Sequence, residues 1–180
     1  MISESSDSHE SHLNSGGDVI NSSYAASSLS TNNFSFNSMP HSLSIYYQNT
    51  RGINSKLNDL YNSLLFCSFD IICLSETWLN DSVSNSEFCP LNFNILRSDR
   101  RFHKLNLTRG GGVLIAFRQH FSITQIDLSS HGFDKLNSVD IIGAKCLYDH
   151  SSFSIFVIYV QPKTDIEEFS LLFNLLSDLI

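Results

Sequence analysis

The chain has 180 residues, of which 42% are hydrophobic and only 16% are charged. This length suits one domain of ordinary size and is too short for two comfortable ones. The three prolines and eight glycines exclude collagen-like and proline-rich classes. The net charge of −7 argues against a uniformly basic nucleic-acid binder, although the average hides how the charge is distributed.

The first part of the chain differs in composition from the rest. Residues 1–40 contain 13 Ser and 5 Asn, no Lys or Arg, and no apolar periodicity. Such a segment buries too little apolar area to offset the entropy lost on ordering. We therefore expect a disordered Ser/Asn-rich leader over 1–41 and a folded domain over 42–180.

Targeting signals and cysteine spacing bear on localisation. The N-terminus lacks a basic region followed by an apolar one, and no apolar run is long enough to span a bilayer. The four cysteines show no metal-binding or redox spacing, which suits a reducing compartment. We expect an intracellular protein, nuclear or cytoplasmic, without a membrane segment. The sequence does not indicate an oligomeric state.

Runs of β-forming residues and helical spacings alternate along the domain. The predicted strands cover 42–49, 70–75, 93–97, 113–117, 123–128, 139–147 and 153–160, and the predicted helices cover about 53–66 and 164–180. In the second helix, Thr164 is the expected N-cap, with Glu167 completing a capping box. This order predicts a mixed α/β architecture with at least one sheet covered by helices.

Two polar residues follow the first two predicted strands. Glu76 comes just after the buried run 70–75, and Asn49 closes the strand before it. A separation of 27 residues fits one strand–helix–strand crossover, which would bring both to the same sheet edge. A carboxylate and an amide oxygen are reasonable Mg²⁺ ligands. The alternatives are a glutamate that points into water and an asparagine that caps the following turn.

The positive charge is concentrated in one stretch. Residues 97–118 hold six Lys or Arg, among them Arg97, Arg100 and Arg109, against the single acid Asp99. A local basic stripe can bind a polyanion even on an acidic protein. The alternative is a solvated loop.

Several of these residues belong to motifs that occur together in known proteins. The motifs are, in order, Tyr47-Gln-Asn-Thr-Arg-Gly52, Asp70-Ile-Ile-Cys-Leu-Ser-Glu-Thr-Trp-Leu79, Arg97-Ser-Asp-Arg100, Arg109-Gly-Gly-Gly-Val113 and Ile158-Tyr-Val-Gln-Pro162. Over 42–180 they resemble the endonuclease/exonuclease/phosphatase superfamily. The closest resemblance is to the apurinic-type endonuclease domain of non-LTR retrotransposon (LINE/jockey-like) proteins.

The resemblance implies a fold and an activity. The fold would be a four-layer α/β sandwich, two central sheets flanked by helices, incomplete at the C-terminus. The activity would be Mg²⁺-dependent hydrolysis of a DNA phosphodiester, with Glu76 as the principal metal ligand and Asn49 beside the metal. Tyr159 would lie at the mouth of the active site. Taken without the resemblance, Tyr159 is better interpreted as a strand-end aromatic covering the core.

The resemblance also implies partners. Arg97, Arg100 and Arg109 would contact the DNA backbone, and a reverse transcriptase domain would follow in a full-length element. Two later motifs, Gly-Asp-x-Asn and Ser-Asp-His, do not occur in the chain. We therefore expect a truncated domain that is inactive or nearly so and poorly soluble over 42–180. The alternatives are a catalytically dead remnant that binds nucleic acid weakly, and a lipid-phosphate hydrolase of the same superfamily.

Overall fold

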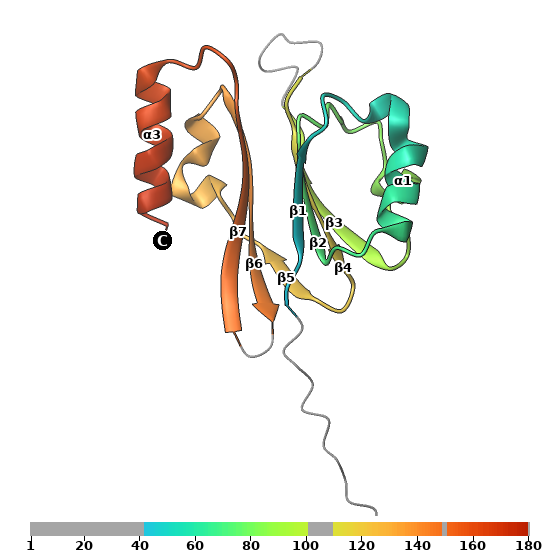
Figure 1. Ribbon diagram of the computed structural model, residues 1–180. Coiled ribbons are helices and arrows are strands. Elements are labelled where there is room, and N and C mark those ends of the chain that lie inside the picture. The colour runs from blue at the N-terminus through green and yellow to red at the C-terminus, as the bar shows by residue number, and fades with distance from the viewer. Residues whose placement is uncertain (1–41, 101–109, 149–150, 180) are drawn as a thin grey trace, which may run out of the picture. The chain divides into compact units, whose positions relative to one another are not determined.

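The computed structural model describes residues 42–100, 110–148 and 151–179, and in these residues seven strands form two sheets (Figure 1). The predicted leader 1–41 lies outside the described residues. The strands are β1 Ile45–Asn49, β2 Ile71–Ser75, β3 Phe93–Ser98, β4 Val113–Arg118, β5 Ser122–Gln125, β6 Val139–Tyr148 and β7 Ser151–Val160. The helices are α1 Leu57–Phe66 and α3 Ile166–Ser177, with short 3-10 helices at Asn54–Lys56, Asn85–Glu87, Ser129–His131 and Phe133–Lys135.

The first sheet has the strand order β1-β2-β4-β3. Strands β1 and β2 are parallel and are connected through α1, as predicted for a crossover, whereas β4 runs antiparallel to both β2 and β3. Every residue of β2 is buried, which explains its continuous apolar run. Strand β1 lies at the edge of the sheet, and all five of its residues are exposed.

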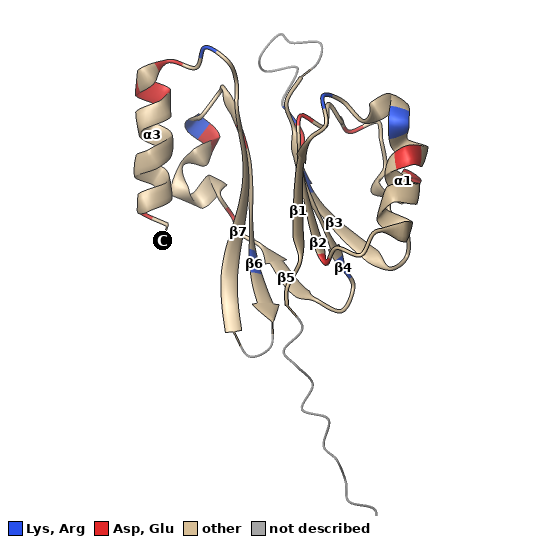
Figure 2. Ribbon diagram, in the orientation of Figure 1, with Lys and Arg blue, Asp and Glu red and all other residues tan. Residues whose placement is uncertain are grey.

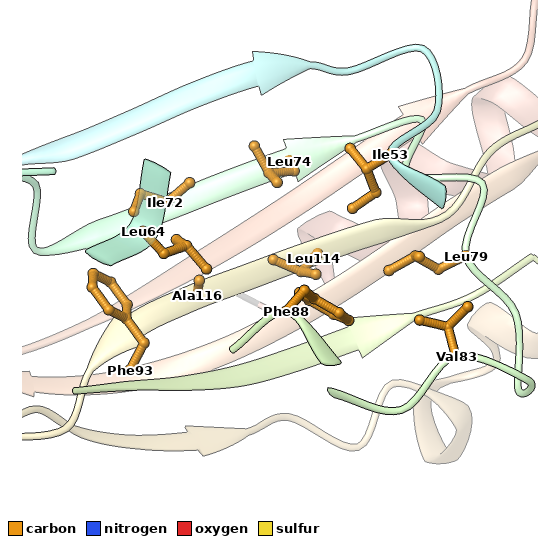
Figure 3. Close-up of a cluster of buried hydrophobic side chains, with 10 residues drawn as sticks. All are labelled: Ile53, Leu64, Ile72, Leu74, Leu79, Val83, Phe88, Phe93, Leu114 and Ala116. Atoms are coloured by element: carbon orange, nitrogen blue, oxygen red, sulfur yellow. The ribbon is translucent and has the colours of Figure 1, made fainter. Parts of the chain in front are cut away.

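Alternate residues of this sheet face two different cores. Figure 3 shows the outer core, in which Ile72 and Leu74 of β2 lie beside Leu114 and Ala116 of β4. Leu64 of α1 packs against this face and is almost fully buried. The amphipathic helix predicted over 53–66 therefore covers the sheet, although its first turn is a 3-10 helix.

The inner face of the first sheet packs against the second sheet. Strands β5, β6 and β7 form an antiparallel sheet in that order. Its inward residues share one buried cluster with the first sheet, made of Ile71, Cys73, Val113, Ile115, Phe117, Phe121, Ile142, Ala144, Cys146 and Val157. Burial of these side chains on folding joins the two sheets face to face.

Helix α3 covers the other face of the second sheet. Leu172 is buried there with Val139, Phe133 and Leu136. The layers are therefore helix, sheet, sheet and helix, which confirms the predicted α/β sandwich class. In the described part of the chain, neither helix combines the length and the apolar character needed to cross a membrane.

Some element boundaries differ from the sequence prediction. The strand predicted over 123–128 ends at Gln125, because Asp127 accepts hydrogen bonds from the backbone and hydroxyl of Ser129 and forms a turn. The last helix begins after Asp165, whose carboxylate accepts a hydrogen bond from the Glu168 amide. Asp165, and not Thr164, is therefore the N-cap.

Candidate active site

The structure brings Asn49 and Glu76 to the same edge of the first sheet. Asn49 pairs with Ser75 in the parallel register of β1 and β2, and Glu76 is the next residue. Asn49 also caps its own turn, because its Oδ1 accepts a hydrogen bond of 3.2 Å from the Arg51 amide. Asn49 therefore caps the turn that follows it, and it also lies at the same sheet edge as Glu76.

The backbone at Glu76 has an unusual conformation. Its φ is +53°, and Trp78 has a φ of +57°, so two residues with side chains occupy the left-handed region within one loop. Each such residue costs roughly 1 to 2 kcal/mol relative to ordinary backbone. The surrounding contacts must therefore hold the loop in place.

Two neighbouring segments provide those contacts. On one side, the Gly52 amide donates to the Glu76 carbonyl at 2.7 Å, and the Thr50 hydroxyl donates to the same carbonyl at 3.0 Å. On the other side, the amides of Thr77 and Trp78 donate to the carbonyls of the glycine run, at 3.2 and 2.9 Å respectively. Both edges of the loop are thus paired, which fixes the direction in which the Glu76 side chain leaves it.

Tyr159 reaches the Glu76 side chain from the second sheet. It lies near the end of β7 on the face that packs against the first sheet, and it is close enough to Glu76 for that carboxylate to act on the pKa of its phenol. Burial, followed by the hydrogen bond and the negative charge of Glu76, raises the pKa of Tyr159 to about 12. The phenol is therefore protonated at neutral pH and can donate a hydrogen bond.

A buried ion pair lies beside Tyr159. The Arg100 guanidinium donates from Nε to both carboxylate oxygens of Asp140, at 3.2 and 3.0 Å, and its Nη2 also contacts Oδ2. The Cζ atom of Arg100 lies 5.5 Å from the centroid of the Tyr159 ring. Arg100 is only 6% exposed. The cation thus lies between the tyrosine and the carboxylate of Asp140.

The glycine run completes this arrangement. The Gly112 amide donates to Asp140 Oδ2 at 3.0 Å. At Gly111, where φ is +70°, a β-carbon would lie 2.2 Å from both Arg100 Nε and Asp140 Oδ2. Only glycine fits there, because the backbone passes directly over the ion pair.

The three predicted DNA-contacting arginines have different positions. Arg100 is buried in the ion pair, and Arg97 donates to the carbonyls of Asn80 and Val83 and pairs with Asp99. Both guanidinium groups are bonded within the chain, so a contact with the DNA backbone stays a prediction for them. Arg109 lies outside the described residues.

Asp140 is a site residue that the sequence analysis missed. The described strands contain four charged residues, Arg97, Arg118, Asp140 and Lys145, and Figure 2 shows how sparse charge is on the sheets. Asp140 is the one acid in these strands, and it faces Tyr159 across the β6–β7 register. The signal was present in the sequence, because alternation places Asp140 on the same inward face as Ile142 and Ala144.

The side-chain oxygens at this edge of the first sheet suit a hard cation. Glu76 offers carboxylate oxygens and Asn49 an amide oxygen, and Mg²⁺ usually takes only one or two protein carboxylates. Glu76 itself is half-buried. The part of the chain that the structure describes contains no group of three or more His, Cys, Asp or Glu residues placed to hold a metal.

Comparisons with known proteins give a weak structural likeness. A scan against protein-family models and a search of curated proteins found no match. The structure is similar to D. rerio TDP2 complexed with single strand DNA product, with 14% identity and a TM-score of 0.47, covering 74% of this chain and 52% of that one. It is also similar to a humanized D. rerio TDP2 with 14 mutations, with 14% identity and a TM-score of 0.46, covering 76% and 57% respectively. The chain thus spans about half the length of these structures.

Proposed function

We propose that the chain is part of a metal-dependent phosphodiesterase that hydrolyses DNA. The observation that carries the proposal is the placement of Asn49 and Glu76 at one edge of the first sheet by the parallel pairing of β1 with β2. Tyr159 of the second sheet lies near this edge and acts on the same carboxylate. The sequence motifs that contain these three residues support the same conclusion, because they resemble the endonuclease/exonuclease/phosphatase superfamily.

The residues of the edge would have separate tasks. Glu76 and Asn49 would hold Mg²⁺, which when bound supplies positive charge next to the phosphate oxygens. Tyr159 donates a hydrogen bond, and a protonated phenol at the edge can stabilise negative charge that develops on a phosphate. The Asn49 amide nitrogen can orient the phosphate through a second donated hydrogen bond.

We further propose that the enzyme is of the non-LTR retrotransposon type, nicks target DNA and acts together with a reverse transcriptase domain. The support is the residue sequence of the motifs, above all Ser75-Glu-Thr-Trp-Leu79 and Arg109-Gly-Gly-Gly112. Hydrolysis of a phosphoinositide or sphingomyelin, with no activity on DNA, would contradict this assignment and favour a lipid-phosphate hydrolase.

The metal site is tested by titrating the 180-residue chain with Mn²⁺, with binding followed by electron paramagnetic resonance. We expect one site, which Glu76→Gln weakens by at least about tenfold because it removes the carboxylate charge. The matched control is Glu167→Gln, which removes a carboxylate from an exposed position in the first turn of α3. Binding that is equally strong in wild type and Glu76→Gln would contradict the site.

Cleavage is tested with supercoiled plasmid in Mg²⁺. We expect the chain to bind DNA at low salt and to nick it slowly or not at all, because general-base catalysis contributes about 10²- to 10⁴-fold and the later motifs are absent. Salt-sensitive binding without any nicking supports the nucleic-acid-binding remnant. Nicking that survives Glu76→Gln, or no DNA binding at low salt, would contradict the proposed function.

A further inference from the structure

The Arg100–Asp140 pair lies where the two sheets meet, next to the proposed catalytic edge. Asp140 comes from β6 of the second sheet, and Arg100 follows β3 of the first sheet. The side chains of the pair are 4% and 10% exposed. The pair therefore joins both sheets inside the protein, and DNA cannot reach the guanidinium in this arrangement.

Two chains of contacts lead from Asp140 to the edge. In the first, Asp140 holds Arg100, and the guanidinium lies over the ring of Tyr159, whose phenol interacts electrostatically with Glu76. In the second, Asp140 Oδ2 accepts the Gly112 amide, while the Gly112 carbonyl accepts the amide of Thr77, the residue after Glu76. One carboxylate thus acts on both partners of the Glu76–Tyr159 contact.

Stability alone does not account for such a pair. Two charges removed from water lose hydration, and apolar residues of similar size often stabilise a fold equally well or better. A charged pair differs from an apolar one in direction, since the planar guanidinium and the carboxylate accept only a few mutual geometries. The same geometry fixes where the cation lies over the ring and where the glycine backbone passes.

We infer that Asp140 and Arg100 are positioning residues that hold Tyr159 and the Glu76 loop in contact, and that Arg100 serves this role instead of binding DNA phosphate. The importance of this positioning for catalysis rests on the proposed function. The Arg100–Asp140 pair and its place over the Tyr159 ring involve neither of the proposed metal ligands directly. The two can therefore be tested separately.

The test uses the 180-residue chain with ring-labelled tyrosine, in which the Tyr159 resonance is assigned with Tyr159→Phe. In the wild-type background, we expect Glu76→Gln to shift that resonance, because the charge of Glu76 acts on the Tyr159 phenol. The same substitution is then made in the double variant Arg100→Met/Asp140→Leu, which replaces the ion pair by apolar side chains. We expect Glu76→Gln to have almost no effect on Tyr159 in that background.

The matched control is Arg118→Met. Like Arg100, Arg118 lies over an aromatic ring, with its guanidinium carbon 4.9 Å from the centroid of Phe93, and its guanidinium is hydrogen-bonded within the chain. It is the last residue of β4, whereas the glycine run precedes the first residue of that strand. We expect the effect of Glu76→Gln on Tyr159 to be unchanged in this control. Thermal unfolding of each variant shows whether it is folded.

Mn²⁺ affinity gives the second readout. A variant that retains a cooperative melt and has lost the positioning pair should bind Mn²⁺ about 10- to 100-fold more weakly, which is the usual effect of disturbing groups that orient a metal ligand. A wild-type chain that binds no Mn²⁺ through Glu76 contradicts the proposed function and leaves the resonance test to decide the positioning role.

The inference is overturned if Glu76→Gln shifts the Tyr159 resonance equally in the wild-type and double-variant backgrounds. If the double variant does not fold, Asp140→Asn replaces it, since this change keeps the volume and one oxygen acceptor but removes the charge. A folded Asp140→Asn protein that keeps the full Glu76–Tyr159 coupling also overturns the inference. If neither variant folds, the pair is a requirement for folding and the positioning role is rejected.

Discussion

Single residues at the sheet edge that holds Asn49 and Glu76 occupy positions that few other side chains could fill. Glu76 has a left-handed backbone, and Gly111 leaves no room for a β-carbon above the Arg100–Asp140 pair. The Glu76 backbone is held by Thr50 and Gly52, and Gly111 meets Asp140 of the second sheet. Substitutions at such positions therefore report on contacts between segments that are distant in the sequence.

Gly111→Ala should destabilise the protein by about 2 to 4 kcal/mol, since it combines a left-handed backbone with a clash against a buried ion pair. The measurement is urea unfolding followed by circular dichroism. Gly132→Ala is the matched control, because its φ is +87° but its β-carbon would have no neighbour within 3.7 Å. The control should lose only about 1 kcal/mol, and an equal loss in both variants would rule out the clash.

Asp70 gives a pH-dependent prediction at the start of β2. Its carboxylate accepts hydrogen bonds from the Ser44 amide at 2.8 Å and from the Ser44 hydroxyl at 2.6 Å. Burial raises the pKa of Asp70, but the Ser44 hydrogen bonds, together with His120 and Arg118, outweigh it and lower the pKa below its ordinary value of 3.8. The ionised carboxylate therefore stabilises the fold above about pH 4, and this contribution is lost as the pH falls through the lowered pKa.

Asp70→Asn should accordingly cost about 1 to 2 kcal/mol of unfolding free energy at pH 7. The difference between wild type and Asp70→Asn should shrink as the pH falls below 4, because the wild-type carboxylate then becomes protonated. Urea unfolding at a series of pH values measures it. A difference that stays constant down to pH 2 would contradict the assigned hydrogen bonds.

At the scale of elements, the start of helix α3 depends on both a local cap and a tertiary contact. The capping-box pattern predicts that α3 starts at Thr164, whereas Asp165 is the observed cap. The Glu168 carboxylate accepts hydrogen bonds from the backbone amides of Asn137 and Ser138, which lie in the segment that leads into β6. That contact ties the first turn of α3 to the second sheet.

Asp165→Ala should therefore lower the free energy of unfolding by about 1 kcal/mol, the usual cost of removing an N-cap. Thr164→Ala is the comparison, because the Thr164 hydroxyl donates only to the Gln161 carbonyl of the preceding turn. Thermal unfolding of both variants measures the difference. A larger loss for Thr164→Ala would reinstate Thr164 as the functional cap.

At the scale of the whole molecule, β1 ends the first sheet, and among the described strands none pairs with its outer edge. All of β1 is exposed, and Ile45 and Tyr47 are 47% and 59% accessible. An exposed apolar edge strand can pair with another chain. We therefore expect the protein to associate as its concentration rises, in keeping with the poor solubility expected from the sequence.

Ile45→Lys should reduce this association, because a charge on an edge strand opposes pairing with a second strand. Leu91→Lys is the control, since Leu91 is 91% exposed but lies in the turn before β3. Light scattering across a concentration series measures the mass of each variant. If the two lysines act equally, general hydrophobicity drives association and the edge does not.

The sequence alone determined the elements and their class, because strands and helices follow from local periodicity. The strand before Asn49, the buried run before Glu76 and the crossover helix between them were all predicted, and so was their parallel pairing. It also indicated Asn49, Glu76 and Tyr159, through motifs that each lie within a few residues.

Only the tertiary structure decided how those residues are combined. The contact of Tyr159 with Glu76, the burial of Arg100 and the part played by Asp140 depend on how two sheets face each other. Residues separated by 40 positions, such as Arg100 and Asp140, have no shared local pattern. Their pairing is selected by packing and by the cost of leaving a buried charge alone, and both of these exist only once the chain has folded.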